Sequence, residues 1–139
     1  MKVLLDTNVI IDAITGREPW NKDAEQIFIF AANQTADIYI TATAATDIYY
    51  LIRKYFHSTS EAKSIMKKLY TLFGILSVTA ENCISALQSE IDDYEDALVD
   101  SIALYYKMNY IVTRNLKDFE KGKTSIISPA DFLILLQDV

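Results

Sequence analysis

The sequence alternates short, almost wholly apolar runs with longer stretches whose apolar residues recur at helical spacing. Short apolar runs are typical of strands buried on both faces, and an apolar residue every three or four positions is typical of an amphipathic helix. The pattern predicts strands at 2–6, 37–41, 74–78, 109–113 and 124–128, and helices at 21–32, 44–56, 58–73, 79–90, 94–108 and 129–137. This alternation predicts an α/β fold with a mainly parallel central sheet of four to five strands and helices on both faces.

The chain length and composition fit one domain that covers residues 1–139. With only three glycines and two prolines, the sequence has little room for a flexible linker. No apolar run approaches the roughly 20 residues of a membrane helix, and Asp6 and Asp12 interrupt the first apolar segment, unlike in a signal peptide. The single cysteine, Cys83, cannot form an internal disulfide and fits a reducing compartment. We therefore expect a cytoplasmic location and no membrane partner.

The formal net charge of −6 argues against broad electrostatic capture of nucleic acid. It leaves open a locally basic rim around an acidic site.

Acidic side chains recur where the predicted strands end. In open parallel sheets, ligands bind at the carboxyl ends of the strands. Asp6 directly follows the first strand, Asp47 lies in the helix after the second, and Asp96 lies near the start of the helix before the fourth. The fourth strand is followed by a polar segment that contains Thr113, Arg114, Asn115 and Asp118. Segments far apart in the sequence thus bring acids to one edge of the predicted sheet.

Each acid also has a purely structural interpretation. Asp6 could cap the following helix, and Asp47 could lie on a solvated helix face, although its neighbours are mostly apolar. Glu95 and Asp96 are favoured at a helix N-terminus by the helix dipole alone. Three or four converging carboxylates would repel one another unless a hard divalent cation such as Mg²⁺ lay between them. His57 and Cys83 are each alone of their type, so the sequence offers no zinc-ligand set.

Three segments resemble the PIN domain family: "LLDTNVIIDAI", "TATAATDIYYLIRK" and "DYEDALVDSIALYYKMNYIVTRNLKDF". They occur in the family's order and cover nearly the whole chain. The sequence is most similar to small single-domain bacterial members of the VapC toxin type. The resemblance implies a three-layer α/β/α fold and a Mg²⁺- or Mn²⁺-dependent endoribonuclease that hydrolyses RNA. It also implies the toxin of a type II toxin–antitoxin pair, with a small antitoxin protein as partner and a homodimeric state.

The resemblance assigns site residues position by position. Asp6, Asp47 and Asp96 match the first three acids of the family, which implies that they are catalytic and hold the metal ion, one of them accepting a proton from metal-bound water. The wider family often has Glu where this chain has Asp47. Asn115 falls where the family places its fourth acid. Its amide keeps an oxygen ligand but lacks the negative charge of an acid. Asp118 lies close enough in sequence to compensate.

Further residues around these acids have expected roles. Asn8, Thr113 and Arg114 are expected to contact substrate, although a hydroxyl such as that of Thr113 could instead bond a metal-binding carboxylate. Asp100 lies one helical turn from Asp96 and is an additional candidate. Glu95, by contrast, is expected to point elsewhere on the helix.

Basic and aromatic residues on the two middle helices leave two interpretations open. Lys63 and Lys67 share a helix face and could follow an RNA backbone, or they could form a solvated face. Tyr49, Tyr50 and Tyr55 could stack on bases, but helical spacing favours core packing.

Two other functions compete with the nuclease. A degenerate PIN fold could bind RNA or protein without cutting, and Asn115 keeps that alternative open. A receiver domain or an aspartyl phosphatase would need an acid pair or a D-x-D at the end of the first strand. The sequence there is D-T-N, which disfavours both.

Overall fold

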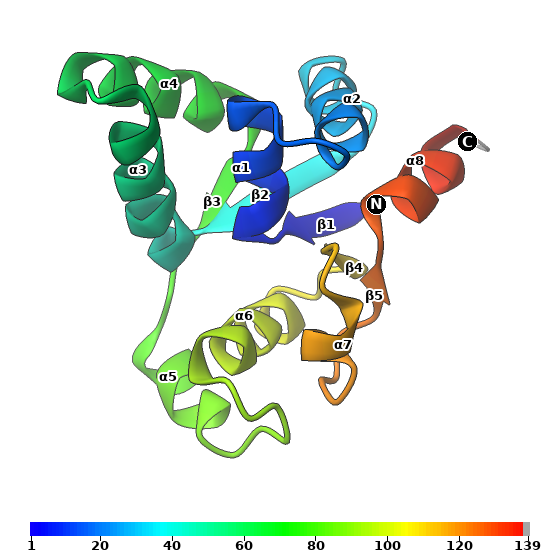
Figure 1. Ribbon diagram of the computed structural model, residues 1–139. Coiled ribbons are helices and arrows are strands. Elements are labelled where there is room, and N and C mark those ends of the chain that lie inside the picture. The colour runs from blue at the N-terminus through cyan, green and yellow to red at the C-terminus, as the bar shows by residue number, and fades with distance from the viewer. Residues whose placement is uncertain (138–139) are drawn as a thin grey trace.

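The computed structural model describes residues 1–137 and is built on a five-stranded, all-parallel sheet (Figure 1). The strands lie in the order β3-β2-β1-β4-β5. Their bounds are β1 (Lys2–Leu5), β2 (Asp37–Thr41), β3 (Gly74–Leu76), β4 (Tyr110–Val112) and β5 (Ile126–Ile127). The central strand β1 pairs on both sides, with Val3 opposite Ile38 of β2 and Tyr110 of β4. The predicted α/β class and parallel sheet are confirmed.

Helices cover both faces of this sheet. The helices α1 to α4 lie on one side and α5 to α7 on the other (Figure 1). Their bounds are α1 (Thr7–Thr15), α2 (Asn21–Ala32), α3 (Ala42–Phe56), α4 (Thr59–Leu72), α5 (Ala80–Ala86), α6 (Tyr94–Tyr105), α7 (Leu116–Phe119) and α8 (Pro129–Gln137). The apolar pattern did not delimit α1 or α7, and the predicted helix at 79–90 ends earlier, at Ala86.

The sheet separates two hydrophobic cores. Val3 and Leu5 pack into a core with α1, α2, α3, α4 and α8, whereas Leu4 packs into a second core with α5, α6 and α7. Successive side chains of a strand point to opposite faces, so a strand that is covered on both sides must be apolar at every position. This explains why the first strand reads as a continuous apolar run.

Three helices near the acids begin at side-chain caps. Asp6 caps α1 directly after β1, and its carboxylate accepts a hydrogen bond from the Thr7 N–H. Thr41, the last residue of β2, caps α3 through the Ala44 N–H. Asp93 caps α6 through the Asp96 N–H. Such caps satisfy N–H groups that have no partner within the helix. Two strand-to-helix junctions, β1–α1 and β2–α3, therefore lie at the carboxyl edge of the sheet.

Among residues 1–137, no helix combines the length and the apolar character that crossing a membrane requires.

Candidate active site

Asp6 is held in one orientation at the end of β1. One carboxylate oxygen accepts from the Thr7 N–H at 2.8 Å. The other accepts from the Thr113 hydroxyl at 2.8 Å and from the Asn8 side-chain amide at 3.1 Å. Burial raises the pKa of Asp6 above its ordinary value, although the hydrogen bonds from Thr113 and Thr7 act in the opposite direction. Asp6 thus caps α1, and its side chain also faces the cleft described next.

The cleft beside Asp6 has a volume of about 380 Å³. Its walls bring together α1, the start of α6 and the segment after β4. The polar side chains that line it include Asp6, Asn8, Asp93, Glu95, Asp96, Arg114 and Asn115. Residues more than 80 positions apart in the sequence therefore meet at the carboxyl edge of the sheet.

Asp96 carries the largest electrostatic perturbation in this cleft. Partial burial is the main cause, and the negative charges of Asp93, Asp6 and Asp118 add to it, so that the pKa of Asp96 rises to about 7. Both effects act against the ionised carboxylate. The lining of the cleft therefore contains more negatively than positively charged side chains.

Asp47 and Glu95 form a second contact between acids. Asp47 lies on an exposed part of α3, despite its apolar neighbours in sequence. A hydrogen bond with Asp47 is the main cause that raises the pKa of Glu95, followed by partial burial and the charge of Asp47. The expectation that Glu95 points elsewhere was wrong. Side chains lean toward the N-terminus of a helix, so both first-turn acids of α6 reach the cleft beyond it.

Asn115 and Asp118 both follow β4 and are exposed, but only Asn115 lines the cleft. The backbone N–H of Asn115 donates to the Thr113 hydroxyl at 3.0 Å, while the Asn115 side chain makes no capping bond to α7. The charge of Asp118 contributes to the raised pKa of both Asp6 and Asp96. Asp118 therefore lies within electrostatic reach of the cleft.

Thr113 and Asn8 are both directed at Asp6. Thr113 is fully buried, and its hydroxyl donates to the Asp6 carboxylate. This contact corrects the expectation that Thr113 touches substrate, because a fully buried hydroxyl that is already bonded to Asp6 positions that carboxylate. The Asn8 amide donates to the same carboxylate, and its carbonyl oxygen is buried without a hydrogen-bond partner in the structure.

Arg114 is tied to an acid that the sequence did not single out. Its Nε and one terminal nitrogen donate to the carboxylate of Asp12 at 2.7 and 3.3 Å, and Asp12 is 1% exposed. The guanidinium also lies 4.1 Å from the centre of the Trp20 ring. Arg114 still borders the cleft, but two of its donors are engaged within the chain and unavailable to a phosphate. The only local hint was an aspartate within the apolar run "NVIIDAI".

Asp100 does not belong to the cleft, so its selection as an additional candidate was wrong. It is 5% exposed, and its carboxylate accepts from the backbone N–H groups of Lys123 and Thr124 at 3.0 and 2.9 Å. A Cβ atom on Gly122 would lie 2.8 Å from the Asp100 carboxyl carbon. Asp100 thus fixes the segment that leads into β5, which places it in a structural role.

The donor set of the cleft suits a hard divalent cation. Carboxylate and amide side chains line it together, and the buried Asn8 carbonyl oxygen accepts no hydrogen bond within residues 1–137. Among residues 1–137, no three Asp, Glu, His or Cys side chains are arranged as a ready-made metal cage. Mg²⁺ keeps several of its waters and commonly takes only one or two carboxylates from a protein, so it does not require such a cage.

The comparisons with known proteins agree with this fold. The family model described as a PIN domain matches residues 2–117. Because this match spans most of the chain, the chain belongs to the PIN domain family, as its sequence resemblance indicated. A comparison with curated protein sequences found no match.

Solved structures of toxin–antitoxin proteins are similar in fold. VapBC2 from Rickettsia felis, bound to a DNA fragment from its promoter, is 19% identical over 92% of this chain and 98% of that chain, with a TM-score of 0.69. DNA-bound VapBC from Salmonella typhimurium is 19% identical over 93% and 98%, with a TM-score of 0.70. VapC20 from Mycobacterium tuberculosis, a sarcin-ricin loop cleaving toxin, is 14% identical over 78% and 86%, with a TM-score of 0.61. At these identities the similarity establishes the fold.

Proposed function

We propose that this chain is a Mg²⁺- or Mn²⁺-dependent endoribonuclease and the toxin of a type II toxin–antitoxin pair. The observation that carries the proposal is the acidic cleft, where Asp6, Glu95 and Asp96 meet at the carboxyl edge of the sheet with Asp47 beside them. Membership of the PIN domain family and the similarity to a sarcin-ricin loop cleaving toxin both support it. Converging acids repel one another unless a cation binds between them. Enzymes that hydrolyse phosphodiesters with metal ions use carboxylates placed in this way.

In this proposal, Asp6 and Asp96 hold the cation, with Asp47, Asn115 and Asp118 arranged around it. A bound divalent ion supplies an activated water and charge stabilisation on the phosphate. Thr113 and the Thr7 N–H keep the Asp6 carboxylate in its orientation, so that it does not reorganise when substrate binds. The Asn8 side-chain amide completes that support by donating to the same carboxylate.

The experiment that tests the activity is cleavage of mixed cellular RNA by the purified chain. We expect cleavage with Mg²⁺ or Mn²⁺, none with a chelator, and none with Asp6→Asn or Asp96→Asn. The matched control is Asp23→Asn, because Asp23 is an exposed acid on α2, away from the cleft lining. Cleavage that persists in both cleft variants, or that needs no metal, would reject the proposal.

A catalytically degenerate PIN fold that binds RNA or protein is the second candidate. Asn115 favours it, because an amide stands where the resemblance implies a fourth acid. Metal-dependent turnover separates the two functions, since a binding module gives RNA association without product. If the wild-type chain binds RNA without cleaving it, Asn115→Asp is the variant that tests whether the missing charge is the cause.

The toxin role, the antitoxin partner and the cytoplasmic location are part of the same proposal. They are supported by the toxin–antitoxin complexes among the similar structures and by the single cysteine. We expect induced expression of the chain to arrest growth of a bacterial host, and Asp6→Asn to relieve the arrest. Homodimer formation stays a prediction, to be measured by light scattering of the purified chain.

A further inference from the structure

A second groove continues from the acidic cleft along α3. It has a volume of about 420 Å³ and is lined by Ile11, Thr15, Arg17, Leu51, Lys54 and Tyr55. Three of these residues, Ile11, Arg17 and Leu51, also line the acidic cleft. We propose that this groove, the α1–α3 groove, binds the single-stranded RNA segment that flanks the scissile phosphate. The inference rests on the proposed ribonuclease function and adds to it the path of the substrate strand.

The spacing along α3 aligns this groove with the acids. Asp47, Leu51, Lys54 and Tyr55 are separated by four, seven and eight positions, which places them on one stripe of a helix. Asp47 and Tyr55 are about 12 Å apart along the helix axis. A strand with its phosphate at the acids therefore presents a flanking nucleotide to Tyr55.

Charge distinguishes the α1–α3 groove from the cleft beside it. The lining of the groove contains Arg17 and Lys54 and no carboxylate among the described residues, whereas the cleft lining contains five acids: Asp6, Asp12, Asp93, Glu95 and Asp96. Phosphates on either side of a metal-bound phosphate need cations of this kind. The chain has a net charge of −6, yet the charged residues of this groove are positive, which favours a polyanion as the occupant.

Tyr55 offers a fixed aromatic surface. It is 54% exposed, its hydroxyl donates to the Thr15 carbonyl at 3.2 Å, and its ring packs edge-on against Phe56. The prediction of core packing was therefore wrong for Tyr55, as it was for the exposed Tyr50. An exposed ring that is held at its hydroxyl end loses little freedom when a base stacks on it, and stacking tolerates any base.

Arg17 stands where the two cavities join. Its guanidinium lies 5.3 Å from the centre of the Trp20 ring, and Arg114 contacts the same ring at 4.1 Å. Trp20 thereby holds Arg17 at the shared wall. Unlike Arg114, Arg17 makes no ion pair in the described part of the chain, so its charge is available to a phosphate.

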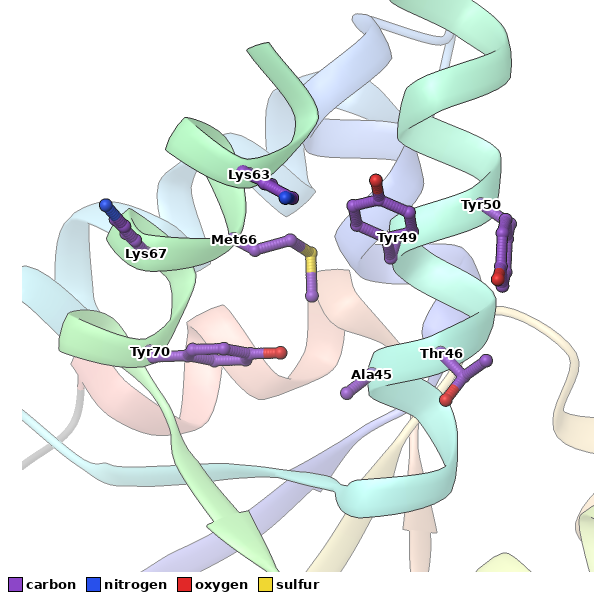
Figure 2. Close-up of a pocket in the computed structure, with 8 residues that line it drawn as sticks. All are labelled: Ala45, Thr46, Tyr49, Tyr50, Lys63, Met66, Lys67 and Tyr70. Atoms are coloured by element: carbon purple, nitrogen blue, oxygen red, sulfur yellow. The ribbon is translucent and has the colours of Figure 1, made fainter. Parts of the chain in front are cut away.

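The groove between α3 and α4 is the internal comparison (Figure 2). It has a similar volume, about 460 Å³, and a similar residue content, with Tyr49, Tyr50, Tyr70, Lys63 and Lys67. Among residues 1–137 it shares no lining residue with the acidic cleft, because Ala45 and Tyr49 lie on the side of α3 opposite Asp47. Its side chains therefore provide matched controls.

The test measures binding of a short fluorescein-labelled single-stranded RNA of mixed sequence by fluorescence anisotropy, in chelator so that no cleavage occurs. We expect Tyr55→Ala to weaken binding by about tenfold and Tyr55→Phe to retain most of it, because the phenylalanine ring still stacks. Lys54→Ala should lower the slope of log affinity against log salt by about one. The controls Tyr70→Ala and Lys67→Ala, which remove an exposed ring and a charge from the groove between α3 and α4, should bind like the wild type.

Several results would overturn the inference. They are unchanged binding in Tyr55→Ala and Lys54→Ala, equal losses in the control variants, or no RNA binding by the wild type at low salt. The metal-dependent cleavage assay is read separately with the acid variants. A chain that cleaves RNA through Asp6 and Asp96 but ignores the α1–α3 groove would leave the ribonuclease standing and reject the groove.

Discussion

Asp96 and Asp100 lie one turn apart on α6, yet they have opposite surroundings. Asp96 faces a cleft in which Asp93, Asp6 and Asp118 add negative charge, and its pKa is raised. Asp100 is buried, and backbone N–H groups of Lys123 and Thr124 donate to its carboxylate. Helical spacing alone places the two acids on the same face.

The difference shows how to separate a structural acid from a functional one. A buried carboxylate whose oxygens are occupied by donors of its own chain stabilises the fold. A carboxylate that is surrounded by other carboxylates lacks such compensation, so a cation from outside the chain would relieve the repulsion. Four predictions test this division, in order of decreasing expected effect.

The largest effect is expected for Asp96→Asn. We predict that cleavage of RNA in Mn²⁺ falls by about a hundredfold or more, because the variant lacks a proposed cation ligand. The unfolding temperature should stay the same or rise, because one of the repelling charges is removed. Initial rates and thermal unfolding of the same preparation check both parts. A variant that unfolds earlier and cleaves normally would assign Asp96 the role we give to Asp100.

The reverse result is expected for Asp100→Ala. One buried and one partly buried N–H group lose a charged acceptor, so the free energy of unfolding should fall by about 3 kcal/mol. The rate per folded molecule should remain that of the wild type. Urea unfolding gives the stability, and initial rates corrected for the folded fraction give the activity. Gly122→Ala provides an independent check, because its new Cβ would press on the Asp100 carboxyl group and should also lower stability alone.

The dependence of stability on pH is expected to come from the acidic cleft. Because the pKa of Asp96 is about 7 in the folded chain and ordinary in the unfolded chain, the folded chain binds more protons between these values. Without metal, the contribution of Asp96 to stability is therefore fully present below about pH 4 and is lost as the pH rises toward about 7. Added Mg²⁺ or Mn²⁺ should raise the unfolding temperature by a few degrees above pH 7 and have little effect near pH 4.

Thermal unfolding in chelator and in metal, across this pH range, measures both trends. Asp96→Asn should flatten them. If its profile overlays that of the wild type, the cleft is not the source of the pH dependence.

The smallest effect is expected for Asn115→Asp. A carboxylate in place of the exposed amide adds a charged oxygen beside the cleft, so the Mn²⁺ concentration for half-maximal cleavage should fall by a few-fold. The control is Asn33→Asp, because Asn33 is exposed at the end of α2, outside the cleft lining. Equal shifts in both variants would show a general charge effect instead of a site at Asn115.

The sequence was sufficient for the architecture and for part of the cleft. Continuous apolar runs predicted strands covered on both faces, and the two cores around Val3, Leu4 and Leu5 confirm that pattern. Asp6 could be predicted as a site residue because the apolar run directly before it marks the end of a strand. The short helix α7 escaped notice, because four residues are too few to show helical periodicity.

The tertiary structure decided which polar groups meet. Asp12 pairs with Arg114 across 102 positions, Asp100 accepts from residues 23 and 24 positions away, and Glu95 meets Asp47 from another helix. Hydrophobic periodicity depends only on residues within a few positions of one another, so it carries information about local structure alone. The protonation and hydrogen bonding of a carboxylate depend on groups that folding brings within a few ångströms. For this reason the sequence by itself determined the sheet, most of its covering helices and the place of Asp6, while folding alone decided which acids are compensated within the chain and which face the open cleft.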